Sequence, residues 1–179
     1  MIIEAVSLRI AEGIKRQVPE HKSSVNVLKH AISIVLNVVL IVAATLIVSL
    51  FTGNTKEAAI ALVSFALLRQ FSGGLHLKTG ISCVLVTTAL FTAISYIDLS
   101  VMYLQILNAL SLLLVLIYVP CKIEKQSRIP KKYYPVLRVI CAVMVLASML
   151  IQSPTLAVTF FVQALSLIHR KEVRDHVTD

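Results

Sequence analysis

Charged residues are scarce in this chain, and their scarcity sets its class. Only 15% of its 179 residues are charged and 58% are hydrophobic, whereas ordinary soluble domains have about 25% charged residues. A chain of this size and composition has no room for a separate soluble domain. We therefore expect one integral membrane domain over residues 1–179, with an amphipathic cytoplasmic segment at 1–29, a transmembrane bundle at 31–168 and a cytoplasmic tail at 169–179.

The sequence also lacks an early signal sequence, cysteine pairs and clusters of metal ligands. Its first long apolar run begins near residue 31, so we expect the N-terminus to stay in the cytoplasm. Cys83, Cys121 and Cys141 are an odd number of cysteines with no C-x-x-C pair, which suggests neither a disulfide framework nor a zinc site. We expect no metal and no other cofactor.

Apolar segments fill most of the remaining chain. They lie at about 31–52, 57–71, 81–97, 99–119, 136–152 and 154–168. A helix that crosses the hydrocarbon core needs about 20 residues, so the first and fourth segments are long enough, while some others are short enough to be re-entrant. The sequence predicts an all-α membrane protein with about six transmembrane helices.

The distribution of lysine and arginine predicts the orientation. Six crossings from a cytoplasmic start leave only Lys56 of the 17 cations outside. The cations placed inside are Arg9, Lys15, Arg16, Lys22, Lys29, Arg69, Lys78, Lys122, Lys125, Arg128, Lys131, Lys132, Arg138, Arg170, Lys171 and Arg174. This bias favours two cytoplasmic termini, and it accounts for the net charge of +8 without a nucleic-acid partner.

The first residues have the pattern of a helix that lies on the membrane surface. Apolar residues recur every four positions, at Ile2, Val6, Ile10, Ile14 and Val18, and charged residues occupy other faces. Pro19 closes this predicted interfacial helix. At the other end of the chain, Ser153 and Pro154 are suited to cap and begin the last apolar helix after a tight turn.

The stretch "RQFSGGLHLKTGISC", residues 69–83, interrupts the apolar sequence with reactive side chains. A cysteine nucleophile needs a base within about 3 Å, and His76 is the candidate base for Cys83. In a straight helix their Cα atoms would stand about 10 Å apart, so the backbone must fold back. Gly73, Gly74 and Gly80 permit this because glycine reaches positive φ and lets chains approach closely.

A simpler interpretation is also open. A glycine-rich loop of a transporter can hold a histidine by chance, and a cysteine at a helix start is commonly a small core residue. The alternative function is therefore a non-enzymatic multispan peptide transporter or export scaffold. A proton-coupled transporter normally has an ionisable group inside a span, and this chain has none clearly placed there.

The pattern R-x-x-x-G-G-x-H-x-x-x-x-x-x-C in a small, basic, six-span protein resembles the AgrB family of membrane cysteine peptidases, which mature bacterial quorum-sensing peptides. The resemblance covers nearly the whole chain, including the amphipathic start and the loop "VPCKIEKQSRIPKKYYPVLR" between the fourth and fifth segments. It implies a multi-pass protein of the bacterial cell membrane with its active site on the cytoplasmic side.

By position, the resemblance implies that Cys83 is the nucleophile and His76 its base, with Arg69, Gly73 and Gly74 as supporting residues. The implied partner is an AgrD-like precursor whose acidic tail is cleaved through an acyl thioester, followed by closure of a thiolactone or lactone ring. The sequence identifies no third catalytic residue. It leaves open whether the protein is a monomer or a homodimer.

Lys131 and Lys132 lie in a loop with six cations and one acid, Glu124. They are candidates to bind the acidic tail of such a precursor. Anionic lipids of the inner leaflet attract the same cations, at roughly 1 kcal/mol each, and both interactions can hold at once.

The charge bias predicts a testable topology. Single cysteines placed at 72–80 and 120–135 in a cysteine-free background should be protected from an impermeant maleimide added to intact cells, because both segments are expected inside. Cysteines at 53–56 and at 98 should react. Labelling of the 120–135 loop from outside would overturn the topology and the cytoplasmic site.

Overall fold

The computed structural model describes residues 2–20, 22–74, 79–121 and 130–168, and every regular element within these ranges is a helix. Each of the six apolar segments forms one helix, and the amphipathic start forms another, which confirms the all-α prediction. The chain divides into two compact units, residues 1–55 with 76–92 and residues 56–75 with 93–179.

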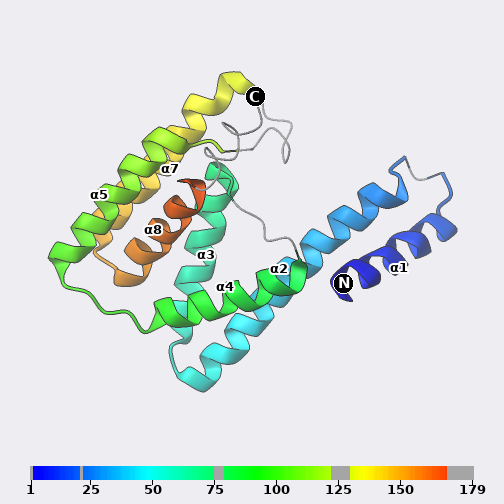
Figure 1. Cartoon of the computed structure of the whole chain (residues 1–179), viewed down its shortest axis with the longest axis horizontal. Coiled ribbons are helices and arrows are strands. Elements are labelled where there is room, and N and C mark those ends of the chain that lie inside the picture. The colour runs from blue at the N-terminus through cyan, green and yellow to red at the C-terminus, as the bar shows by residue number, and fades with distance from the viewer. Residues whose placement is uncertain (1, 21, 75–78, 122–129, 169–179) are drawn as a thin grey trace, which may run out of the picture. The chain divides into compact units, whose positions relative to one another are not determined.

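The first unit consists of α1 (Ile2–Gln17), α2 (Val25–Thr52) and most of α4 (Gly80–Ser95). Figure 1 shows α1 running back alongside the first part of α2, against which it packs. The Oγ1 atoms of Thr45 on α2 and Thr88 on α4 lie 3.5 Å apart. These contacts join the three helices into one body.

Helix α1 has two different nonpolar faces. Ile3, Ser7 and Ala11 are buried at four-residue spacing, and Ser7 Oγ donates to the Ile3 carbonyl oxygen at 2.6 Å. The second face is the apolar stripe that was predicted to meet the membrane. Unlike the first face it is exposed, with Val6 and Ile10 at 42% and 41%. Small residues therefore let α1 pack closely on the protein while its larger apolar side chains remain free to contact lipid.

Helix α2 has side-chain and glycine caps that fix its two ends. At the start, the backbone N–H of Val27 donates to Ser24 Oγ at 3.4 Å. At the end, Gly53 has a φ of 78° and its N–H donates to the Ser49 carbonyl oxygen. Both are common ways to satisfy backbone groups that a helix end leaves unpaired.

The second unit is built around α8. It consists of α3 (Thr55–Ser72), α5 (Val101–Tyr118), the short 3₁₀ helix η1 (Lys131–Tyr133), α7 (Tyr134–Ile151) and α8 (Pro154–Ile168). Helix α8 packs against both α5 and α7. Seven of its 15 residues are buried, namely Thr155, Ala157, Thr159, Phe160, Gln163, Ala164 and Leu167.

The core of this unit joins four helices. Its buried members are Leu68, Val115, Val119, Cys141, Val145, Phe160, Ala164 and Leu167. Gln105 Nε2 on α5 donates to the Met149 carbonyl oxygen on α7 at 3.2 Å. The turn between α7 and α8 is tight as predicted: α8 begins at Pro154, and the N–H of Leu156 contacts Ser153 Oγ at 3.5 Å.

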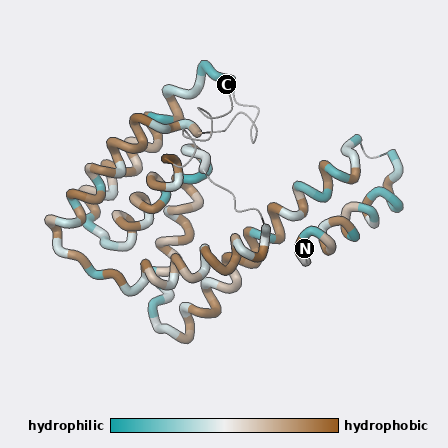
Figure 2. The backbone as a smooth tube through the Cα atoms, viewed as in Figure 1, coloured by the Kyte–Doolittle hydropathy of each residue, from teal (hydrophilic) through white to brown (hydrophobic). Residues whose placement is uncertain are grey.

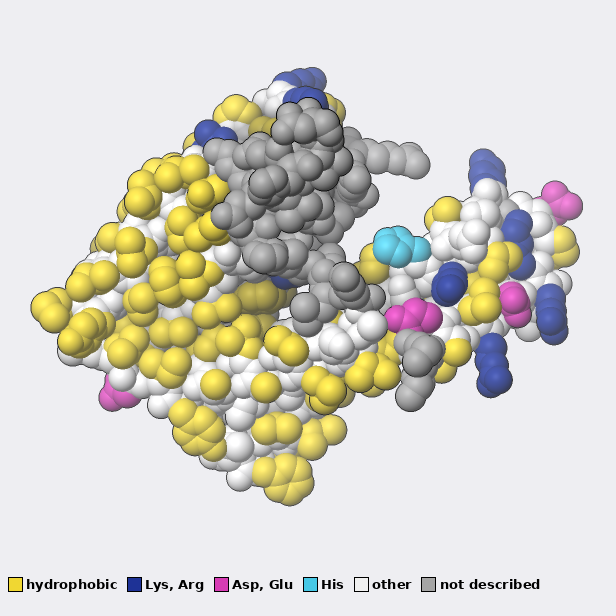
Figure 3. Space-filling model, viewed as in Figure 1, with side chains coloured by type: hydrophobic (Ala, Val, Ile, Leu, Met, Phe, Trp, Pro, Cys, Tyr) yellow, Lys and Arg dark blue, Asp and Glu magenta, His cyan; other side chains and the backbone are white. Residues whose placement is uncertain are grey.

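The exposed surface suits hydrocarbon rather than water. Phe51 and Leu150 are 89% and 85% exposed. Figure 2 shows long hydrophobic stretches along α2, α4 and α5, and in Figure 3 hydrophobic side chains cover the visible surface over α5. Three described helical stretches, Val25–Thr52, Val101–Tyr118 and Lys131–Ile151, are long and apolar enough to cross a membrane, while α4 and α8 are shorter apolar helices. Six crossings stay a prediction.

Packing around α8 predicts the effect of enlarging one buried residue. Ala164 is fully buried in the core, so Ala164→Leu should destabilise the folded protein by about 1–3 kcal/mol. In detergent, with Cys83 and Cys121 replaced by serine, the temperature at which buried Cys141 reacts with a maleimide should fall by roughly 2–12 °C. The neighbouring change Leu165→Ala, at a 42% exposed position, should have little effect. Equal shifts for both variants would contradict this description of the core.

Candidate functional site

Cys83 lies in the first turn of α4. Its backbone N–H donates to the Thr79 carbonyl oxygen at 3.1 Å, and Thr79 Oγ1 caps the helix by accepting from the N–H of Ser82 at 3.3 Å. Cys83 is half-buried, and its Sγ lies 4.0 Å from Thr87 Oγ1. The first turn of a helix carries partial positive charge, so this is a favourable position for an anionic group.

The start of α4 is in close contact with α1 and α2. A Cβ at Gly80 would lie 2.9 Å from Ile3 Cδ1 and 3.5 Å from Asn37 Oδ1, so a larger residue here would force the Ile3 side chain to shift. Among the described residues, Asn37 Oδ1 is buried and finds no hydrogen-bond partner. The three helices of the first unit therefore meet one turn before Cys83.

The predicted site residues fall in both units and partly outside the described residues. Cys83 belongs to the first unit, whereas Arg69, Gly73 and Gly74 lie together at the end of α3 in the second. His76 lies outside the described residues, so its pairing with Cys83 stays a prediction. Within the described ranges, no three His, Cys, Asp or Glu side chains lie close enough together to hold a metal ion.

A turn of two glycines ends α3. The N–H of Gly73 donates to the Arg69 carbonyl oxygen at 2.9 Å, after which the backbone leaves the helix. Gly73 has a φ of 75° and Gly74 a φ of 150°, values that residues with a Cβ rarely adopt. The positive φ for which the sequence favoured glycine is thus present at 73 and 74, three and two positions before His76.

Gly74 is also crowded by polar side chains. A Cβ at this position would lie 3.1 Å from Gln163 Nε2, 3.3 Å from Arg69 Nη1 and 3.4 Å from Ser166 Oγ. The Arg69 guanidinium also stands over the Phe65 ring, with its Cζ 5.6 Å from the ring centroid. The turn therefore brings a fixed cation and a buried amide against one piece of backbone.

Hydrogen bonds from two distant parts of the chain hold this turn. Gln163 Nε2 donates to the Gly73 carbonyl oxygen at 2.7 Å and to Ser72 Oγ at 3.0 Å. The Ser72 carbonyl oxygen accepts from the N–H of Cys121 at 2.9 Å, which forms an isolated parallel bridge between residues 73 and 121. Ser72 and Gln163 are fully buried, so these polar groups are satisfied inside the unit.

The segment that carries Cys121 is itself held by α7. Arg138 Nε donates to the Val119 carbonyl oxygen at 2.8 Å, just beyond the end of α5. Val119 is buried, and the Arg138 side chain thus reaches back to the unpaired carbonyl that follows the helix. Three helices, α5, α7 and α8, therefore support the turn at the end of α3.

Gln163 is the residue of this arrangement that sequence reasoning missed. Its signal was an uncharged polar side chain inside the apolar segment "TLAVTFFVQALSLI", and such residues commonly join helices within membranes. Nothing in the sequence indicated which backbone it would bind, because Ser72 and Gly73 are about 90 residues away. Of the polar residues beside the motif, Gln70 is exposed and Ser72 is buried.

Lys131 and Lys132 are exposed on η1, at the start of α7 in the second unit. Lys132 Nζ lies over the Tyr133 ring, 4.9 Å from its centroid. Residues 122–129, which hold the other cations expected in this loop apart from Arg138, lie outside the described residues. The two lysines are accessible, and their binding to an acidic tail or to lipid stays a prediction.

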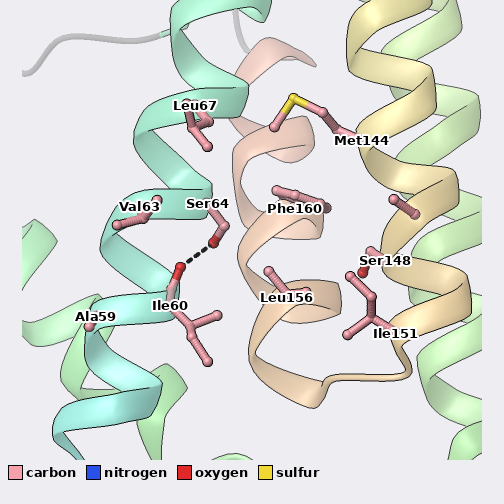
Figure 4. Close-up of a pocket in the computed structure, with 11 residues that line it drawn as sticks. Ala59, Ile60, Val63, Ser64, Leu67, Met144, Ser148, Ile151, Leu156 and Phe160 are labelled. Atoms are coloured by element: carbon pink, nitrogen blue, oxygen red, sulfur yellow. Dashed lines mark hydrogen bonds between the residues drawn. The ribbon is translucent and has the colours of Figure 1, made fainter.

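An apolar groove separates α3 from α7 and α8 (Figure 4). Its volume is about 510 Å³, and its lining includes Val63, Leu67, Met144 and Phe160. Ser64 on its wall donates to the carbonyl oxygen of Ile60 on its own helix, at 2.6 Å. None of the candidate catalytic or supporting residues is among the residues that line this groove.

Comparison with known proteins identifies a related sequence. A putative AgrB-like protein of Halalkalibacterium halodurans is 30% identical over 110 residues, which are 62% of this chain and 56% of that protein. The match thus spans little more than half the length of the relative. No solved structure matches the chain.

The family comparison covers far more of the sequence. The sequence pattern of the family described as Accessory gene regulator B matches residues 7–168. This range contains all the described helices except the start of α1, and it includes the full 69–83 stretch with Arg69, both turn glycines, His76 and Cys83. The chain therefore belongs to the accessory gene regulator B family, AgrB.

Proposed function

We propose that this chain is a membrane-embedded cysteine endopeptidase that removes the C-terminal tail of a small AgrD-like precursor and promotes its cyclisation. The observation that carries the proposal is the family match over residues 7–168, which includes the 69–83 stretch. Family membership links the chain to accessory gene regulator quorum sensing. The position of Cys83 in a capped first helical turn supports its role as nucleophile.

The first chemical step is acyl transfer to Cys83. His76 takes the proton from Sγ, and the thiolate attacks the carbonyl carbon that precedes the precursor's tail. The carbon–nitrogen bond then breaks, and the protonated imidazole gives its proton to the leaving amine. The tail departs, and the rest of the precursor remains on Cys83 as a thioester.

Ring closure follows from the reactivity of that thioester. A thiol or hydroxyl earlier in the peptide attacks the thioester carbonyl, forming a thiolactone or lactone and releasing the Cys83 sulfur, which regains its proton. An internal nucleophile held near the carbonyl has a large entropic advantage over water. A site at a membrane surface also limits water, which would otherwise hydrolyse the intermediate.

The turn at the end of α3 supplies supporting groups in this proposal. The Arg69 guanidinium lies against Gly74, where a fixed positive charge can bind a substrate carboxylate or stabilise the oxyanion that forms during attack. Gly73 and Gly74 leave the backbone open for that approach. An Arg69 side chain that only extends toward lipid headgroups would not need to lie against this turn.

The proposed reaction takes place at the cytoplasmic face of a bacterial cell membrane. Lys131 and Lys132 are exposed cations at the start of α7, and they attract both the acidic tail of the precursor and anionic lipids. One integral membrane domain suffices for this chemistry, whether the protein acts as a monomer or as a homodimer.

Replacing either member of the proposed pair should abolish processing. Cys83→Ala removes the nucleophile, and His76→Ala removes general acid–base catalysis, which contributes about 10²–10⁴-fold. Tail release from a co-expressed precursor, followed by mass spectrometry at equal membrane levels, should therefore fall at least about a hundredfold in both variants. The matched control is Cys121→Ala, which removes a half-buried thiol and keeps the backbone N–H that binds Ser72.

The same experiment separates the peptidase from an export scaffold. Wild-type protein should form a Cys83 adduct with the precursor that hydroxylamine cleaves, as expected of a thioester. Full tail release by Cys83→Ala would instead favour the non-enzymatic transporter or scaffold.

Neutralising the two lysines should weaken recognition more than chemistry. Exposed ion pairs contribute about 0.2–1 kcal/mol each, so Lys131→Gln with Lys132→Gln should raise the apparent KM roughly two- to thirtyfold. The rate at saturating precursor should change less, because this binding is shared by ground and transition states.

A charge-matched control is Lys15→Gln with Arg16→Gln at the end of α1. Lysines added to the precursor tail should restore part of the affinity to a Lys131→Glu, Lys132→Glu variant if the contact is direct. An unchanged KM in the double glutamine variant, with the protein correctly inserted, would eliminate the lysines as a tail-binding site.

A further inference from the structure

Gln163 stands out among the buried polar residues of the second unit. It is fully buried in the apolar helix α8, where an unsatisfied amide would be strongly unfavourable. Its amide nitrogen has two protons, and the two bonds described above direct them to Ser72 Oγ and the Gly73 carbonyl oxygen. A carbonyl oxygen can only accept, so the NH₂ group must face the turn. Both N–H donors of the Gln163 side chain therefore bind two adjacent residues, Ser72 and Gly73.

Neighbouring groups fix the orientation of this amide. Ser166 Oγ donates to the Gln163 backbone carbonyl at 2.7 Å and also lies 3.4 Å from Gln163 Oε1. Within the turn, Ser72 Oγ also donates to the Gly73 carbonyl oxygen at 3.0 Å. The amide therefore has one favourable arrangement, and it contacts the turn from the α8 side while Cys121 contacts the same turn through its own N–H.

We propose that Gln163 is a positioning residue of the peptidase site: its side-chain amide fixes the Ser72–Gly74 turn, which immediately precedes the stretch of sequence that carries His76. This inference rests on the proposed function of His76. Gly74 is two residues before the histidine, and Gln163 Nε2 is the atom that a Cβ at Gly74 would approach most closely. The amide thus sets the backbone path at the last two described residues before the catalytic base.

A residue with this role acts on the reaction rate rather than on affinity. Proton transfer between Cys83 and His76 requires their side chains to meet within hydrogen-bond distance, and a displacement of about 1 Å can reduce a rate about a hundredfold. Gln163 itself is buried and touches the turn, so substrate binding does not depend directly on its side chain. Loss of the amide should therefore lower kcat and leave KM nearly unchanged.

The test compares Gln163→Met with Thr159→Val. Methionine keeps the length of the side chain and removes both donors. Thr159 lies one turn earlier on α8 and is fully buried, and its Oγ1 has no hydrogen-bond partner among the described residues. Gln163→Met should lower kcat for tail release roughly ten- to a hundredfold, with KM within about twofold of wild type. Thr159→Val should leave both constants within about twofold.

A second readout does not depend on the precursor. The pH dependence of Cys83 alkylation by iodoacetamide, measured with Cys121 and Cys141 replaced, reports whether a base is beside the thiol. In Gln163→Met this profile should move toward that of His76→Ala, while in Thr159→Val it should stay with wild type. A general loss of packing on α8 would alter the profile in both variants, whereas loss of the positioning role should alter it only in Gln163→Met.

Ser72→Ala provides a smaller perturbation in case Gln163→Met folds poorly. It removes one of the two acceptors and leaves the Gly73 bond, so kcat should fall less than in Gln163→Met. Wild-type kcat and alkylation profile in both Gln163→Met and Ser72→Ala would overturn the positioning role.

The parent protein and Cys83→Ala are measured alongside these variants. Tail release by Cys83→Ala would refute the proposed peptidase. An inactive Cys83→Ala together with a fully active Gln163→Met would refute only the inference about Gln163.

Discussion

Backbone that leaves a helix among apolar neighbours must still find hydrogen-bond partners, and the second unit depends on how this constraint is met. The chain leaves α3 at Gly73, and its carbonyl groups there cannot be satisfied by a continuing helix. Gln163 and the N–H of Cys121 supply the donors from two different parts of the chain. Gln163 can bind the turn only when α8 is packed in place, and the Cys121 N–H only when the segment after α5 is in place. The turn is therefore held from two parts of the unit, and the rest of the 69–83 stretch continues from a backbone held in this way.

The helices were readable from the sequence because the signals for them are local. Apolar runs of 15 to 22 residues, and the serine and proline that begin the last of them, are signals contained within a few turns of chain. Each expected apolar segment corresponds to one helix, with ends shifted by at most six residues, and Pro154 begins α8 as predicted. The charge bias gives an orientation, but charge does not decide whether the shorter helices, such as α4, cross completely.

The candidate site was readable only in part because its contacts are not local. The motif identified Cys83 and the two turn glycines, whose positive φ follows from the chemistry of glycine itself. It could not indicate that a lone amide near the end of the chain binds that turn, or that Arg138 reaches back to Val119. Such pairings depend on how helices assemble in three dimensions. A polar residue in an apolar run signals that a partner exists without naming it.

The contact between Ile3 and Gly80 links the position of α1 to that of α4. A helix with an exposed apolar stripe such as that of α1 settles where its stripe meets hydrocarbon and its charges meet headgroups. Ile3 packs directly against the first residue of α4, so a displacement of α1 changes this contact. Any movement of α1 along its axis is therefore transmitted to the first turn of α4, and so to the backbone that carries Cys83.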